Sequence, residues 1–260
     1  MRKPALLLLA FLCTIAPGLA TAAGYPADPL KSPMWDMHAK RLFGGAPVVF
    51  DKALKMEMPV LAEDQHVFPV AVDATALKDV RRIVIFADLN PIPVALDYTP
   101  VRAAAYVATR IKLDQRTPVR AAVLTADGTW HVAGNWVDAA GGGCSAPPRG
   151  RVKGDWAEHL GEMRGEAWQE GGHVRLRFTV RHPMDTGLVE NVPAYNLDAM
   201  TVRDAAGTVL GRMVLYGALS EDPAFTLAVD PSRPGPISIS LHDTNGREFE
   251  GNLPDGGGSK

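Results

Sequence analysis

Cysteine is scarce in this sequence, and the common catalytic motifs are missing. The 260 residues include only two cysteines, Cys13 and Cys144. There is no Gly-x-Ser-x-Gly elbow, phosphate-binding loop or dinucleotide fingerprint. The seven histidines are scattered, with no His-x-His or His-x-x-x-His spacing that would suggest zinc. With a formal net charge of −2 and no long basic run, nucleic acid is not expected as a partner.

Long apolar runs are absent beyond the N-terminus. Arg2 and Lys3 precede an apolar stretch at 5–19, and Ala20-Thr21-Ala22 follows as a small-x-small cleavage pattern. This arrangement predicts a signal peptide at residues 1–22 and a periplasmic location, with no membrane partner after cleavage. A lipoprotein is disfavoured because Leu12 precedes Cys13 where a small residue is needed. Cleavage would leave Cys144 as the one cysteine.

The first half of the mature chain reads as β-structure. Residues 23–47 contain four prolines and are expected to be irregular. Short apolar or alternating runs then recur about every ten residues through 48–140, and Asp127-Gly128 is a hairpin turn between two of them. This spacing predicts a β-sandwich.

The strand pattern stops at a stretch rich in glycine and proline. Gly141, Gly142 and Gly143 precede Cys144, and Ser145-Ala146-Pro147-Pro148 follows. We expect a flexible arm and linker at 141–165, in which 156–164 forms either a short helix or more linker. The arm should separate two domains.

A second strand-rich region covers 166–256. Residues 173–180 alternate between apolar and polar side chains, and Asn245-Gly246 is a strong hairpin turn. The sequence therefore predicts an all-β protein with two immunoglobulin-like β-sandwich domains in tandem.

Cys144 is the main candidate for chemistry. Three glycines offer few neighbours to bury it, so we expect an exposed, reactive carrier thiol rather than a structural cysteine at the edge of the sandwich. Its ordinary pKa of ~8.5 could be lowered by Arg149 and Arg151 and raised by Asp138. A cysteine hydrolase is disfavoured because a mobile segment does not hold a nucleophile in fixed geometry.

Copper is the one metal with any support. Met34, Met37 and His38 lie close in sequence, and a Met56-x-Met58 pair precedes His66. Thioethers and imidazoles suit copper, but methionine also fills irregular cores. No specific ligand spacing exists, so neither a metal nor another cofactor is expected.

Two stretches carry a resemblance to a known family. The region from His173 to about Pro254 resembles the SoxZ subunit of the thiosulfate-oxidation carrier. Its signature is His182, Pro183, Met184, Asp185, Thr186 and Gly187, which on chemistry alone would be an ordinary loop. The first half, which ends in Gly-Gly-Gly-Cys144, is similar to the SoxY subunit. The order of the two resembles the fused quinoprotein dehydrogenase-associated SoxYZ-like carriers.

The resemblance implies a periplasmic carrier and not an enzyme. Cys144 would hold a sulfur-containing or other small intermediate on an arm formed by the three glycines. Partners would be periplasmic enzymes of sulfur oxidation or a PQQ-dependent dehydrogenase. In the alternative, the chain is an accessory module of that dehydrogenase and Cys144 carries nothing. The arm also departs from the SoxY pattern, since it is held at both ends and its reach should be shorter.

Overall fold

The computed structural model describes residues 24–147, 149, 155–170, 172–230 and 236–253. The signal-peptide prediction, Arg151 and most of the expected linker at 148–154 lie outside them. No helix in these ranges is long and apolar enough to cross a membrane. The elements of the first half are α1 (Trp35–Phe43), β1 (Val48–Phe50), β2 (Lys55–Glu57), β3 (Phe68–Asp73), β4 (Val80–Ala87), β5 (Val94–Pro100), β6 (Tyr106–Ile111), β7 (Thr117–Thr125) and β8 (Trp130–Val137). Those of the second half are β9 (Met163–Glu170), β10 (His173–Val180), β11 (Leu197–Arg203), β12 (Val209–Leu215), β13 (Ala224–Val229), β14 (Ile237–Asp243) and β15 (Glu248–Leu253).

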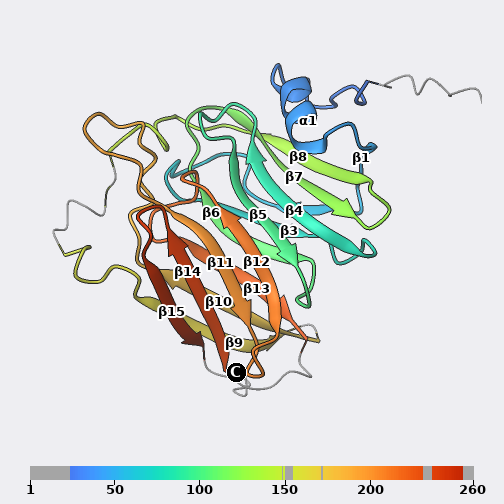
Figure 1. The fold of residues 1–260 in the computed structure, drawn as a ribbon. Coiled ribbons are helices and arrows are strands. Elements are labelled where there is room, and N and C mark those ends of the chain that lie inside the picture. The colour runs from blue at the N-terminus through green and yellow to red at the C-terminus, as the bar shows by residue number, and fades with distance from the viewer. Residues whose placement is uncertain (1–23, 148, 150–154, 171, 231–235, 254–260) are drawn as a thin grey trace, which may run out of the picture.

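Each half is an immunoglobulin-like sandwich, which confirms the predicted fold class, and the two halves are joined strand to strand. One sheet has the order β1-β8-β7-β4-β5-β12-β11-β14-β15 and the other β2-β3-β6-β13-β10-β9. The halves meet where β5 pairs antiparallel with β12 and β6 pairs antiparallel with β13. Both sheets therefore run continuously through the molecule (Figure 1).

The apolar core is also continuous between the halves. One cluster of buried residues includes Phe68 and Ile111 from the first half and Phe178, Leu215 and Phe225 from the second. Phe178 and Phe225 have ring centroids 5.4 Å apart. Burial of aliphatic and aromatic surface is the main favourable term in folding, so the halves stabilise each other.

The N-terminal segment is not irregular as predicted, because it contains α1. Trp35, His38, Ala39 and Phe43 are buried, and this spacing places them on one face of a helix. That face packs on the outer side of the larger sheet, against Val84, Phe86, Ala122 and Trp130 (Figure 1). The four prolines misled the prediction; Pro33 lies before α1 and Pro47 after it, so neither interrupts it.

A buried ion cluster fixes this segment to the sheet. Arg120 on β7 is 1% exposed, and its Nε donates to Asp88 Oδ1 at 2.9 Å. Its Nη2 donates to Asp28 Oδ2 at 2.7 Å, and its guanidinium lies 4.8 Å from the Trp35 ring centroid. Burial raises the pKa of Asp28, but the hydrogen bonds from Arg120 and from two backbone amides outweigh this and lower it overall.

Three strands were not predicted from the sequence. β9 covers part of the stretch expected to be a short helix or linker, and it is a mostly exposed strand at a sheet edge paired with β10. β2 is short and also at an edge. β5 lies between the two halves, and its Asp97 is paired with Arg82. Strands at edges or with paired charges lack the apolar alternation on which the prediction depended.

Candidate functional site

The glycine segment is packed against the first half, contrary to the expected arm. A Cβ on Gly143 would lie 2.3 Å from Gln65 O and 2.5 Å from Leu113 O. Gly141 has a φ of +107°, which side-chain-bearing residues rarely adopt. Gly142 N and Gly143 N donate to Asp114 O and Leu113 O. These glycines permit close approach of two backbones and do not extend a tail.

Asp114 anchors the cysteine itself. Its Oδ1 accepts hydrogen bonds from Cys144 N and Ser145 N, both at 3.0 Å, and from Ser145 Oγ at 2.9 Å. Asn90 in turn holds this turn of chain, because its side chain bonds Lys112 O and Asp114 N. Asn90, the first residue of the Asn-Pro-Ile-Pro loop, thus holds Asp114, and Asp114 holds the cysteine.

Cys144 is buried, and the expectation of an exposed thiol is wrong. The residue is 1% exposed and is not in a disulfide. Burial raises the pKa of its thiol to about 12, while Lys112 acts to lower it and Asp114 to raise it. Arg149 and Asp138 do not act on it as proposed, since they pair with Asp64 and Arg116.

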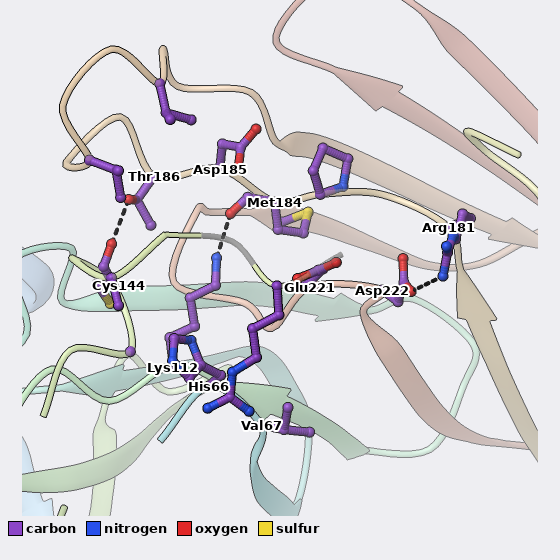
Figure 2. A pocket seen from close by; sticks show the side chains of 16 residues that line it. His66, Val67, Lys112, Cys144, Arg181, Met184, Asp185, Thr186, Glu221 and Asp222 are labelled. Atoms are coloured by element: carbon purple, nitrogen blue, oxygen red, sulfur yellow. Dashed lines mark hydrogen bonds and ion pairs between the residues drawn. The ribbon is translucent and has the colours of Figure 1, made fainter. Parts of the chain in front are cut away.

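Cys144 is covered by a segment of the second half, residues 182–188, which we call the strap. Thr186 Oγ1 donates to the carbonyl of Cys144 at 2.7 Å, as Figure 2 shows. Gly187 has a φ of +76°, and a Cβ there would lie 3.0 Å from Ala194. The family signature lies about forty residues after Cys144 in the sequence, and the structure brings it into contact with Cys144.

His182 shapes the strap and does not face the thiol cavity. Its Nδ1 accepts the backbone N–H of Met184 at 3.1 Å, so its proton is on Nε2, which lies 3.8 Å from Asp243 Oδ2. The ring packs on Tyr195 with centroids 4.7 Å apart. Burial lowers the His182 pKa to about 4, so the imidazole is neutral. The bond to Met184 fixes that residue in a left-handed turn with a φ of +51°.

Lys112 connects the two halves beside the cysteine. It follows β6 and is only 6% exposed. Its Nζ donates to Met184 O in the strap and to Gly217 O at 3.1 Å. Burial lowers the Lys112 pKa to about 8, against the opposing effects of Cys144, Asp185 and Glu221.

A cavity of about 190 Å³ lies between the halves at this point (Figure 2). Its walls include Cys144 and Gly143 from the glycine segment, Lys112 and His66 from the first half, and Pro183, Met184, Asp185 and Thr186 from the strap. Burial is the main reason that the pKa of His66 is lowered, so its imidazole is neutral near pH 7. The site is therefore a thiol, an ammonium and a neutral imidazole around one small space.

Sequence reasoning identified the thiol and the strap but missed Lys112, Asp114 and His66 in these roles. His66 was considered only as a copper ligand. Lys112 follows the alternating β6 run directly, and a polar residue at a strand end is usually solvated. Its burial depends on residues 72 and 105 positions away, which no local pattern contains.

The residues considered for copper do not form one site. His38 Nε2 lies 2.8 Å from Asp88 O beneath α1, whereas His66 lines the thiol cavity. Met56 and Met58 pack against the main core. Within the described ranges, no three His, Cys, Asp or Glu side chains are grouped so as to hold a metal ion.

Comparison with known proteins assigns both halves. Residues 39–144 match the family described as sulfur oxidation protein SoxY, and residues 163–254 match sulphur oxidation protein SoxZ. No curated protein matches the chain. A solved structure, the sulfur carrier protein SoxY from Chlorobium limicola f thiosulfatophilum, is 21% identical and covers 41% of this chain and 96% of its own, with a TM-score of 0.37.

The chain is thus a two-domain protein of the sulfur-oxidation carrier class. The two matches occur in tandem and together cover most of the sequence. It belongs to the fused SoxYZ-like carriers, as the glycine-cysteine stretch and the strap signature predicted. The SoxY match ends at Cys144 itself, which places the thiol at the last position of that domain.

Proposed function

We propose that this protein is a periplasmic carrier that holds a sulfur-containing intermediate covalently on Cys144 while partner enzymes act on it. The observation that carries the proposal is the placement of Cys144. It is the only cysteine of the described residues, it ends the SoxY match, and it lines a cavity to which both halves contribute. The N-terminal sequence pattern supports export, and the family resemblance supports a functional link to a quinoprotein dehydrogenase.

The carrier role is consistent with the groups that lie around Cys144 among the described residues. With the His66 and His182 pKa values lowered by burial, neither imidazole is charged at neutral pH. His182 is committed to shaping the strap. A thiol with a pKa of about 12 is also a weak nucleophile as it stands. Chemistry at Cys144 would therefore be performed by partner enzymes after the strap has opened.

Mass spectrometry of protein purified natively from the periplasm tests the carrier function. We expect an adduct on Cys144 that reductant removes and that is absent from Cys144→Ser. Ser145→Ala is a matched control, because it changes the neighbouring residue and leaves the thiol in place. Native protein whose Cys144 is always unmodified, including during growth on reduced sulfur compounds, would contradict the proposal.

One observation favours a second candidate function. The burial and raised pKa of Cys144 are also what an inert structural cysteine would show. In that case the protein would be an accessory module of a PQQ-dependent dehydrogenase, and Cys144→Ser would bind the dehydrogenase and support its activity as the unaltered protein does. Loss of dehydrogenase activity in Cys144→Ser, with binding retained, would favour the carrier.

A further inference from the structure

Lys112 is a buried cation that has no carboxylate in direct contact among the residues that the structure describes. Lysine is almost never fully buried unless it is paired, yet Lys112 is 6% exposed. In the ranges that the structure describes, its Nζ forms no salt bridge, and its acceptors are the carbonyls of Met184 and Gly217. An ammonium group has three N–H donors. Two are used, so one remains for a group in the cavity that Lys112 lines.

Two of the other charges around the cavity are paired with groups other than Lys112. Arg181 Nη1 pairs with Asp222 at 2.7 Å, and Arg149 pairs with Asp64 at 2.8 Å. The titratable and charged groups that face the cavity are His66, Lys112, Cys144, Arg149, Arg181, Asp185, Glu221 and Asp222. Asp185 and Glu221 act on Lys112 only through longer-range attraction. The positive charge nearest the thiol is therefore not neutralised by direct contact.

We propose that Lys112 is the residue that makes the carrier selective for negatively charged groups on Cys144. The inference rests on the carrier function proposed above. The third N–H of Lys112 would donate to an oxygen at the free end of the adduct, while the other two keep the strap in place. A cavity of about 150 Å³ can hold a benzene-sized molecule, so 190 Å³ accepts a short anionic group.

The selectivity follows from electrostatics in a site with little water. An anion beside Lys112 gains a charge-assisted hydrogen bond, which is shorter and stronger than a neutral one. A neutral group of the same size leaves the ammonium as unpaired as before, and a cationic group adds repulsion. Lys112 would thus be a positioning residue that distinguishes loaded forms by charge.

Two chemical adducts with the same two-carbon linker test this directly. Cys144 is loaded at alkaline pH with 2-sulfonatoethyl or 2-hydroxyethyl methanethiosulfonate and returned to neutral buffer. In each case the thiolate forms a disulfide bond to the reagent's sulfenyl sulfur, and methanesulfinate leaves with the electron pair of the broken S–S bond. The products differ only in carrying a sulfonate or a hydroxyl.

We expect the sulfonate form to have the higher Tm in the unaltered protein, and Lys112→Met to abolish or reverse that order. Lys78→Met, which removes an exposed lysine, should preserve it. If Lys112→Met does not fold, the Lys112 pKa is measured by NMR in the unaltered protein. It should rise by roughly 1 to 3 pH units in the sulfonate form, as for other opposite-charge neighbours, and should not rise in the hydroxyl form.

Equal Tm values for the two adducts in the unaltered protein, or an equal Lys112 pKa in both, would overturn the inference. Neither result would bear on whether the native protein is loaded, since the adducts are made chemically. Conversely, native protein that is never modified would contradict the carrier function and leave the charge preference of the cavity standing.

Discussion

Replacing Thr186 with valine should make the thiol of Cys144 react faster. The hydroxyl of Thr186 donates to the Cys144 carbonyl at 2.7 Å, which joins the strap to the glycine segment, and it accepts the N–H of Leu188 at 3.2 Å within the strap. Valine keeps the shape of threonine but can neither donate nor accept; of these two bonds, only the one to Cys144 holds the strap against the glycine segment. A hydrogen bond of this kind contributes about 1 kcal/mol net, so the population of molecules with an open strap should increase about fivefold.

The rate of alkylation by iodoacetamide at pH 8, followed by intact mass, measures that population. A closed thiol with a pKa raised from 9.0 to about 12 has about a thousandfold less thiolate than an unperturbed one, so labelling reports opening. Thr186→Ser keeps the hydroxyl and should label at nearly the original rate. The free energy of global unfolding, measured in urea, must remain well above the free energy of strap opening, so that labelling does not report unfolding of the whole protein. An unchanged rate in Thr186→Val would show that the strap does not control access to the thiol.

Three further outcomes follow from the packing. Arg120→Met leaves two buried carboxylates without their cation and should reduce the unfolding free energy in urea by about 3–5 kcal/mol. Gly143→Ala, whose Cβ meets two backbone oxygens, should cost about 1–3 kcal/mol in the same assay, whereas Gly24→Ala meets nothing and should cost little. The folded state resists protonation of His182, so stability should fall as the pH drops from about 6.5 to about 4, and less so in His182→Asn. Similar pH curves for both proteins would count against that assignment.

The parts of the fold that were predictable are those decided by local alternation. β10 has the bounds that the alternation at 173–180 indicated, and its buried residues are those of the apolar face. α1 was missed although its apolar residues have helical spacing, because the surrounding prolines were given more weight. β9 has no apolar face to detect, since pairing with β10 and not burial holds it in the sheet.

Cys144 and the strap signature could be picked out from the sequence, whereas Lys112, Asp114 and the geometry of the site could not. Three glycines before a cysteine can serve either of two purposes: they make the backbone flexible, or they let it pass close to another backbone. The sequence reading chose the first, whereas Gly143 lies against Leu113 and Gln65. The choice depends on where residues 65 and 113 lie in space. Only the assembled sandwich brings them to the cysteine.

Under the proposed carrier function, fusion of the two halves would let the thiol be buried at rest and exposed when it reacts. The glycine segment is held by Asp114, which bonds Gly142, Cys144 and Ser145, and the chain then continues into the second half. The segment therefore cannot extend far into a partner. The strap that covers Cys144 belongs to the second half, and Lys112 binds it from the first. A partner that displaces the strap would expose the thiol, remove the burial that raises its pKa, and leave Lys112 beside it to favour the thiolate. Opening would then deliver access and reactivity in the same movement, and closure would protect the loaded group from water and stray thiols.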